Sequence, residues 1–222
     1  MQTSRRSILK GSILASLAGT MGATAMSASA AEKQAALPKK EYDLVICGLG
    51  IGGIVTAIRA AQDGLKPVIL EKMSSASGNT IYSAGFMLGV NTKMQQEKKL
   101  ETGDTVDKFY EDMMKVSQGR GDPKLTRLVA EKADETLNWL HDYVGVKYAV
   151  GMKLVWPMLQ RAHLTIGEKK PGGTQLMLYL LAKAKELNVP IVYNAKAVEL
   201  LDNPQNGKVI GVKVKNKIGR AH

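Results

Sequence analysis

The apolar positions between residues 42 and 70 follow a strand–helix–strand pattern. Residues 42–47 and 67–70 are short apolar runs, which are typical of buried parallel strands. Residues 54–63 carry apolar side chains at helical spacing, and Gly64 is placed to end that helix. The pattern therefore predicts the beginning of an α/β domain.

A glycine-rich turn joins the first predicted strand to the helix. Gly48, Gly50 and Gly53 fit the spacing G-x-G-x-x-G. In such a motif the first glycine allows a tight turn, the second lets a pyrophosphate approach the backbone, and the third lets the helix pack against the strand. The free amide groups at the helix N-terminus would then point at the diphosphate.

An acidic residue, Glu71, directly follows the second predicted strand. A carboxylate in this place can accept hydrogen bonds from ribose hydroxyl groups, and it would repel a 2′-phosphate, which disfavours NADP. Strand, glycines, helix, second strand and acid occur in the order that a dinucleotide site requires. The alternative, a glycine-rich turn in another kind of α/β protein, is less well supported by that order.

The residues after Glu71 resemble a known superfamily. Lys72-Met73, Ser77-Gly78-Asn79-Thr80 and Ser83-Ala84-Gly85 are similar to segments of the flavoprotein subunits of fumarate reductase, succinate dehydrogenase and flavocytochrome c. Those subunits have Glu-Lys, Gly-Gly-Asn-Thr and Ser/Ala-Ala-Gly-Gly in this order. The resemblance extends from residue 42 to about residue 215. It implies an α/β fold with a Rossmann-like FAD-binding domain of the glutathione-reductase type, and FAD as the cofactor.

The resemblance also implies which residues contact FAD. Gly52 and Glu71 would touch the adenosine half, and Val198 would offer backbone contacts to the adenine. The stretch from pyrophosphate to flavin would be lined by Asn79, Thr80, Ser83, Ala84 and Gly85. Small residues suit this task because they let backbone amides approach a large planar cofactor.

The later elements follow the family order as well. Helices are expected over residues 104–118 and 122–146, a helix over 174–187, and strands over 191–193, 196–201 and 209–214. An Arg161-Ala162-His163 segment resembles the family's Arg-Ser-His. The chain departs from the family at Ser77, at Phe86 and in the longer loop 164–173, which contains Lys169-Lys170. No catalytic residue is assigned; His163 is interpreted as structural and His141 as a surface residue.

Composition limits the other classes of function. The chain has 222 residues and a formal net charge of +11, but its lysines are scattered and no nucleic-acid motif occurs among them. A basic solvated surface is the simpler interpretation, and docking to an acidic electron-transfer partner or an anionic substrate is the alternative. The single cysteine, Cys47, excludes an internal disulfide and a covalent c-type haem. Its apolar neighbours favour core packing, and with three histidines no metal site is expected.

The first forty residues are expected to be a targeting signal followed by a linker. Arg5-Arg6 stand before an apolar stretch over residues 13–26, and Ala28-Ser29-Ala30 forms a small-x-small cleavage site. This order resembles a twin-arginine signal peptide over residues 1–30, so export to the periplasm is predicted. The apolar stretch is too short for an integral membrane span of ~20 residues. Residues 31–40 are expected to be a flexible lead-in.

Three functional hypotheses remain open. In the first, residues 41–217 are the N-terminal part of an FAD-binding domain, incomplete at the C-terminus and without the capping domain. The parent enzyme would reduce the C=C bond of a fumarate-like unsaturated carboxylate, with electrons from a separate cytochrome or FMN-bearing protein. The alternatives are a ketosteroid dehydrogenase-like flavoenzyme and an FAD-binding module without activity.

The end of the chain affects what this sequence can do alone. Residues 218–222 fit no family pattern and read as a translation of a sequencing adapter, so a non-native tail is expected. The arginines and histidines that bind and protonate substrate in the family lie beyond an FAD-binding segment of this kind. The fragment alone is therefore expected to be inactive.

Overall fold

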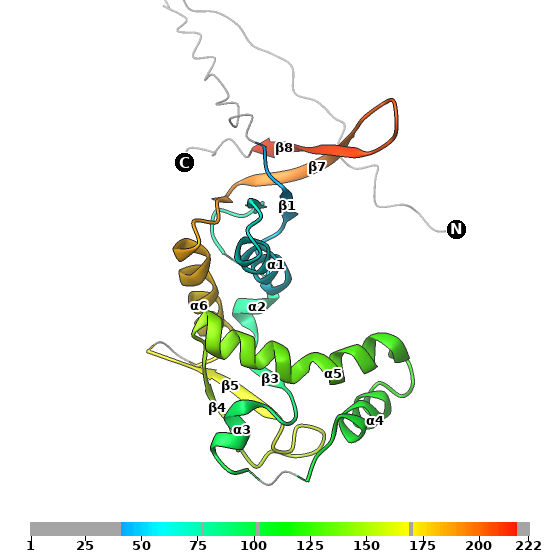
Figure 1. The fold of residues 1–222 in the computed structure, drawn as a ribbon, viewed down its shortest axis with the longest axis vertical. Helices are drawn as coiled ribbons and strands as arrows, with labels where there is room; N and C mark the ends of the chain where they lie inside the picture. Colours follow the sequence, from blue (N-terminus) through cyan, green and yellow to red (C-terminus); the bar gives the residue numbers. More distant parts are fainter. Residues whose placement is uncertain (1–40, 77, 101–102, 169–170, 217–222) are drawn as a thin grey trace, which may run out of the picture. The chain divides into compact units, whose positions relative to one another are not determined.

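The computed structural model describes residues 41–216, except residues 77, 101–102 and 169–170 (Figure 1). The predicted signal peptide (1–30), lead-in (31–40) and tail (218–222), and also Ser77 and Lys169-Lys170, lie outside the described residues. The helices and strands occur in the order β1 (Leu44–Cys47), α1 (Ile51–Gln62), β2 (Pro67–Leu70), α2 (Asn79–Tyr82), β3 (Phe86–Leu88), α3 (Lys93–Glu97), α4 (Val106–Val116), α5 (Pro123–Trp139), the π-helical turn η1 (Leu140–Val144), β4 (Lys147–Ala149), β5 (Ala162–Ile166), α6 (Gly173–Glu186), β6 (Ile191–Val192), β7 (Ala195–Asp202) and β8 (Val209–Asn216).

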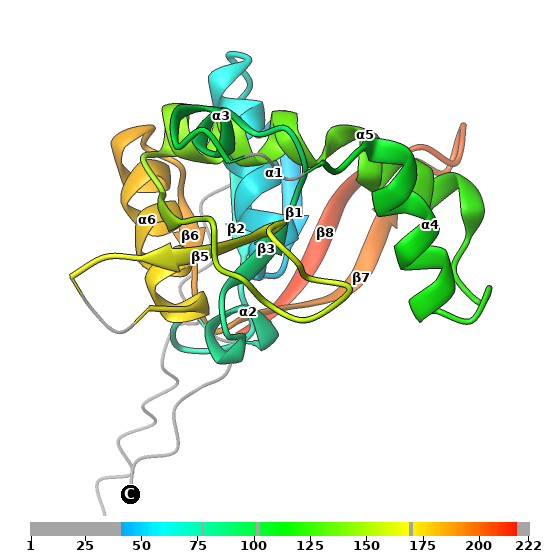
Figure 2. The same ribbon diagram turned by 90° about the horizontal axis from the view of Figure 1, so that it is seen from below.

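Three parallel strands form the sheet that carries the glycine motif, in the order β1–β2–β6 (Figure 2). Every residue of β2 is buried, as its apolar run predicts. Ile69 packs on one face among buried side chains of α1 and α6. Val68 and Leu70 pack on the other face with Ala195 at the start of β7. Because alternate residues of a strand point to opposite faces of a sheet, β2 is covered on both sides.

The first strand is less covered than its sequence suggests. Val45 is 37% exposed and Cys47 is exposed, although the sequence predicts Cys47 in the core. Ile46, on the opposite face of β1, packs against the main core. The start of β7 and the side chains of β8 pack over β2 instead of over Val45 and Cys47. The prediction for Cys47 is therefore wrong, because no described residues form a covering layer on that face of β1.

A second, antiparallel sheet has the strand order β3–β5–β4. Its register pairs Phe86 with Leu164 and Tyr148 with Thr165. Tyr148 belongs to the same buried cluster as Leu137 of α5, and that cluster also includes side chains of α1 and α6. One continuous core therefore joins the helices of the parallel sheet to the second sheet.

The boundaries of α5 follow local sequence signals. The side chain of Asp122 caps the helix by accepting a hydrogen bond from its backbone, and Pro123 occupies the first turn. The helix continues into η1, which Gly145 ends in the left-handed conformation with a φ of 87°. His141, expected at the surface, is partly buried instead, with its Nδ1 2.9 Å from the carbonyl oxygen of Val146. The π-helical turn brings that carbonyl back toward the ring.

Arg161, just before β5, is 1% exposed and lies among carboxylates. Its guanidinium pairs with Asp104 and Asp112, with 2.7 Å between Nη2 and Oδ2 of Asp112, and stacks over the ring of Phe109. A hydrogen bond from the Trp156 indole to Asp112, 2.9 Å long, holds the pKa of that carboxyl below its usual value, and Arg161 adds to the effect. The cluster joins α4 to the loop that leads into β5.

Replacing Arg161 by methionine should lower the free energy of unfolding by about 3–5 kcal/mol, because Asp104 and Asp112 would lose a buried counter-ion. Arg127→Met is the matched control, since Arg127 pairs with Asp107 at the surface and also stacks on a tyrosine ring. An exposed pair contributes about 0–1 kcal/mol. Urea unfolding followed by circular dichroism measures both losses, and equal losses would contradict the importance of the buried cluster.

Candidate functional site

The turn after β1 has the backbone geometry that its glycines predict. Gly48 has a φ of 111°, which other residues rarely adopt, and its amide donates to the carbonyl of Leu70 at 2.8 Å. The helix α1 begins at Ile51, within the glycine motif. A Cβ on Gly53 would lie 2.1 Å from the carbonyl oxygen of Gly48. Gly53 therefore has to lack a side chain for α1 to pack against the turn.

The other two glycines of the turn face open space. A Cβ on Gly52 would meet no atom within 4 Å, and one on Gly50 would meet only the hydroxyl of Thr80 at 4.0 Å. Gly50 is the N-cap of α1 and provides no side-chain cap, while the amide of Ile51 donates to Oγ1 of Thr80 at 3.0 Å. A helix N-terminus that is open and lined by glycine fits a diphosphate, because its amides and its dipole both favour an anion.

Glu71 lies directly behind this turn and is 6% exposed. Its carboxylate accepts hydrogen bonds from the amides of Leu49 and Met73, each 2.8 Å long. These donors offset much of the free-energy cost of burying the charge. The pKa of the Tyr193 phenol is raised, first by burial and then by the nearby Glu71 charge. The structure thus brings the predicted acid together with the predicted glycine turn.

The predicted flavin-side residues form a short helix and a loop next to the turn. Asn79 and Thr80 begin α2, and Ser83 ends it. The hydroxyl of Ser83 donates to the carbonyl of Thr80 at 2.8 Å. Ser83 and Ala84 are exposed, whereas Gly85 is buried with a φ of 76°. Through Thr80, this segment touches the N-terminus of α1, so most of the predicted site residues lie in one place.

Val198 lies far along the chain, on β7, but its strand begins beside the acid. The amide of Ala195 donates to the backbone carbonyl of Glu71 at 2.8 Å. The register between β7 and β8 shifts between Ala197 and Glu199, which leaves Val198 without a partner in the strand ladder. Such a bulge suits a residue that contacts a ligand through its backbone.

Two glycines that the sequence did not assign to the site pack directly on its flavin-side segment. Gly172 and Gly173 are the N-cap and the first residue of α6. A Cβ on Gly173 would lie 1.7 Å from the carbonyl oxygen of Thr80. The sequence does hold a signal for this contact, the Gly-Gly pair directly before the helix. It lies at the end of the loop 164–173, which is interpreted from the sequence only as a departure from the family.

His163 and Arg161 are of residue types that can act on substrates, but both are engaged within the fold. His163 is fully buried, with Nε2 2.8 Å from Oγ1 of Thr92 and Nδ1 2.8 Å from the carbonyl oxygen of Arg161. Burial lowers the pKa of His163 below its usual value of 6.5, so the ring is neutral at physiological pH. The structural interpretation of His163 agrees with these contacts.

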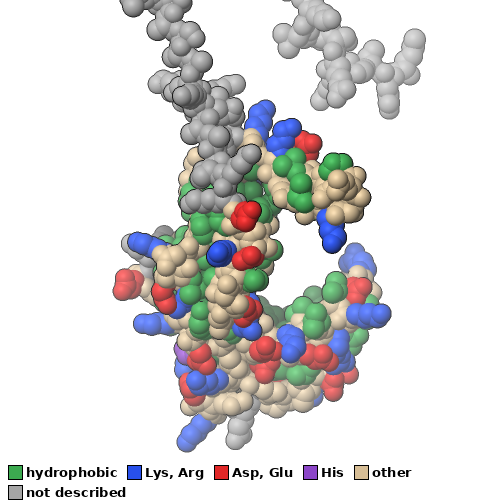
Figure 3. Space-filling model, turned by 45° about the horizontal axis from the view of Figure 1, so that its top comes forward, with side chains coloured by type: hydrophobic (Ala, Val, Ile, Leu, Met, Phe, Trp, Pro, Cys, Tyr) green, Lys and Arg blue, Asp and Glu red, His purple; other side chains and the backbone are tan. Residues whose placement is uncertain are grey.

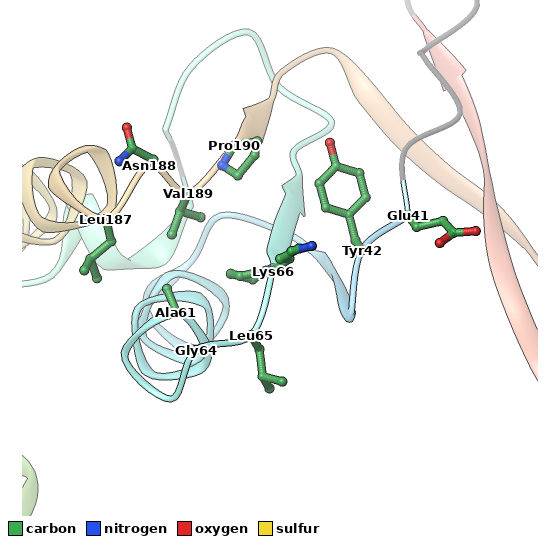
Figure 4. A pocket seen from close by; sticks show the side chains of 11 residues that line it. Glu41, Tyr42, Ala61, Gly64, Leu65, Lys66, Leu187, Asn188, Val189 and Pro190 are labelled. Carbon is green, nitrogen blue, oxygen red and sulfur yellow. The ribbon is translucent and has the colours of Figure 1, made fainter.

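Two surface hollows among the described residues do not coincide with the site. One, of about 480 Å³, opens beside Tyr42 and Pro190 at the amino-terminal ends of the parallel strands (Figure 4). The glycine turn lies at the opposite, carboxyl end of β1, where dinucleotides bind in folds of this kind. The second, of about 440 Å³, lies between β3 and α5 and is lined by residues that include Met87, Leu128 and Val129.

The surface carries charges of both signs. Lys and Arg side chains are interspersed with Asp and Glu side chains on the face in Figure 3. Among the described residues, no set of three or more His, Cys, Asp or Glu is placed to hold a metal ion. Within the same residues, no helix combines the length and the apolar character that a membrane span requires.

Comparison with known proteins identifies a family and several relatives of this chain. A family described as FAD binding domain matches residues 43–221. The chain is 30% identical over 187 residues to the fumarate reductase (cytochrome) of Shewanella frigidimarina, which covers 83% of this chain and 32% of that protein. It is 32% identical over 183 residues to the urocanate reductase of Eggerthella lenta, which covers 79% of this chain and 28% of that protein. The chain thus spans about three tenths of the length of these relatives.

A solved structure shares the fold. The 3-ketosteroid-delta4-(5alpha)-dehydrogenase from Rhodococcus jostii RHA1 matches with a TM-score of 0.68 and 25% identity, over 83% of this chain and 44% of that one. The open glycine turn and the buried acid behind it fit the dinucleotide that the family binds. The chain therefore belongs to the FAD binding domain family, and FAD is its cofactor.

Proposed function

We propose that this chain is part of a longer parent enzyme, an FAD-dependent reductase that acts on the C=C bond of an unsaturated carboxylate of the fumarate type. The observation that carries this proposal is an identity of 30–32%, over 79–83% of this chain, to reductases named for fumarate and for urocanate. Both compounds hold a C=C bond conjugated with a carboxylate. When bound and reduced, the flavin would supply the hydride that, together with a proton, reduces such a bond.

In this proposal the adenosine diphosphate half of FAD binds at the carboxyl end of β1. Its diphosphate binds at the N-terminus of α1 against Gly48, Gly50 and Gly53, where a helix N-terminus stabilises an anion, and Gly52 touches the adenosine half. Each carboxylate oxygen of Glu71 accepts one hydrogen bond from a backbone amide. The remaining lone pairs of these oxygens accept hydrogen bonds from the ribose. The backbone of Val198 contacts the adenine; the bulge in β7 supports this assignment.

The flavin half follows the segment from α2 to β3. The residues assigned to this stretch are Asn79, Thr80, Ser83, Ala84 and Gly85. The amide donation from Ile51 to Thr80 supports the assignment, because it joins this segment to the diphosphate end of the site. Phe86, 38% exposed at the start of β3, then lies next to the flavin-side residues.

The proposal includes an external source of electrons. A separate cytochrome or FMN-bearing protein reduces the bound flavin, and the relative from Shewanella frigidimarina is itself named a cytochrome type of fumarate reductase. Without Arg5, Arg6 and Lys10 of the proposed signal peptide, the formal net charge falls from +11 to +8. This positive charge favours association with an acidic partner, because opposite charges steer encounter.

A second candidate function is oxidation or reduction of a ketosteroid. The TM-score of 0.68 to the Rhodococcus jostii enzyme favours it. The hollow between β3 and α5 adds a local observation, because its lining includes the apolar side chains of Leu88, Leu128 and Val129. The strand β3 directly follows the flavin-side residues 79–85 in the chain. An apolar hollow suits a steroid better than a dicarboxylate.

One assay separates the two candidates. With the parent enzyme under anaerobic conditions, fumarate or a related enoate should reoxidise a reduced viologen dye, because the C=C bond accepts the hydride and a proton. Succinate, which lacks the C=C bond, is the matched control and should leave the dye reduced. Turnover of a 3-ketosteroid without any enoate-dependent dye oxidation would contradict the proposal in favour of the second candidate. Stoichiometric FAD with neither reaction would identify an FAD-binding module.

Glu71→Ala should weaken FAD binding by about tenfold or more, because the ribose loses a charged hydrogen-bond acceptor. Glu71→Gln keeps the side-chain volume and should fall between the wild type and the alanine variant. Glu135→Ala, which removes an exposed carboxylate of α5, is the control and should bind FAD normally. Fluorescence titration of the apoprotein gives the three dissociation constants. Equal affinities for wild type and Glu71→Ala would rule out the ribose assignment.

We propose that residues 1–30 direct export through the twin-arginine pathway, with cleavage after Ala30. Replacing Arg5 and Arg6 together by lysine should retain the protein in the cytoplasm, because the pathway reads the paired arginines. Replacing Lys39 and Lys40 together by arginine is the control, since this pair lies after the cleavage site. Cell fractionation and N-terminal sequencing measure the outcome, with Ala31 expected as the first residue. Unchanged export of the Arg5/Arg6 variant would show that another pathway is used.

A further inference from the structure

The start of α6 is fastened to the flavin-side segment by backbone contacts. The amide of Gly173 donates to the carbonyl of Ser83 at 3.0 Å, and the hydroxyl of Thr174 donates to the carbonyl of Ile81 at 3.0 Å. These bonds join residues that are about 90 positions apart in the chain. The first turn of α6 therefore holds α2 at its carbonyl end.

The strand β5 adds a second connection between the same two segments. The amide of Thr165 donates to the carbonyl of Gly85 at 3.1 Å, and the amide of Gly172 donates to the carbonyl of Thr165 at 3.0 Å. Gly85 and Gly172 also face each other closely, because a Cβ on Gly85 would lie 2.4 Å from the backbone of Gly172. The loop between α2 and β3 is thus held on both sides.

Gly173 has to lack a side chain because of this contact, whereas Gly172 also has a φ of 120°, which other residues rarely adopt. A Cβ on Gly173 would lie 1.7 Å from the carbonyl oxygen of Thr80 and 2.4 Å from Oγ of Ser83. A Cβ on Gly172 would meet the carbonyl oxygens of Ser83 and Ala84 at 3.3 and 3.2 Å. All of these neighbours belong to the flavin-side segment.

The helix itself has no need of a glycine at its first position. Alanine is a better helix former than glycine, and no left-handed φ is found at Gly173. The remainder of α6 is anchored independently, since Leu176, Met177 and Leu180 are buried in the main core. Glycine at position 173 therefore lowers the stability of the first turn of α6, but it allows α2 to pack closely against that turn.

The position of α2 bears directly on the cofactor site. Thr80, against which Gly173 packs, accepts the hydrogen bond from the amide of Ile51 at the N-terminus of α1. We propose that Gly172 and Gly173 are positioning residues for FAD, which hold residues 79–85 in register with the diphosphate-binding turn. The inference rests on the proposed function in so far as residues 79–85 line the flavin half of the cofactor.

Gly173→Ala in the intact protein tests the inference. The added methyl group should displace α2 from α6, weaken FAD binding by about tenfold or more, and change the visible circular dichroism of the flavin that remains bound. Gly211→Ala is the matched control, because a Cβ there would meet only the Leu201 side chain at 3.5 Å, an ordinary contact. It should leave both the FAD dissociation constant and the flavin spectrum unchanged.

A milder variant decides the matter if Gly173→Ala does not fold. Thr174→Val removes only the hydroxyl that donates to Ile81, on an exposed side chain, and should weaken FAD binding by about threefold with a change in the flavin spectrum. If Gly173→Ala folds and has the FAD affinity and flavin spectrum of the wild type, the inference is overturned. If Gly173→Ala does not fold, the same result for Thr174→Val overturns it. These flavin measurements use no enoate. Failure of the reductase proposal would appear separately, as normal FAD binding in the wild type without enoate reduction.

Discussion

The buried carboxylate of Glu71 is the interaction on which the cofactor site depends. Its two oxygens accept amide hydrogen bonds from Leu49, inside the glycine turn, and from Met73, beyond the end of β2. Its own backbone carbonyl accepts the amide of Ala195 at the start of β7. A buried carboxylate is costly unless donors surround it, so the turn, the strand end and β7 have to keep these relative positions. The site is therefore organised by the protein's own hydrogen bonds.

Apart from Gly48, whose φ of 111° itself favours glycine, the glycines in and next to the site differ in what surrounds them, and the difference has functional meaning. Gly53, Gly85 and Gly173 are crowded by backbone atoms of the protein, so packing alone explains why they lack a side chain. Gly50 and Gly52 have open space where a Cβ would project. An open glycine with an ordinary backbone conformation is better explained by a ligand that approaches the backbone. The open pair marks where the adenosine diphosphate half of FAD is proposed to bind.

The buried polar residues around β5, Arg161 and His163, are engaged within the fold and are not part of the site. Arg161 is held by Asp104 and Asp112, and His163 is neutral and bonded to Thr92. A substrate carboxylate could reach Arg161 only by displacing the carboxylates of Asp104 and Asp112 from a buried guanidinium, which is costly in free energy. These residues therefore stabilise the fold beneath the flavin-side segment.

The sequence by itself determined the unit from β1 to Glu71. The bounds of β2, the positive φ of Gly48 and the acid behind the turn follow from periodicity and turn chemistry within about thirty residues. Only the tertiary structure decided the packing of Gly173 on Thr80, the burial of Arg161 beside Asp104, and the exposure of Cys47. The physical reason is that these depend on which distant segments meet. Local patterns specify a strand, a helix or a turn, whereas close packing between residues far apart in the chain is settled only when the layers assemble.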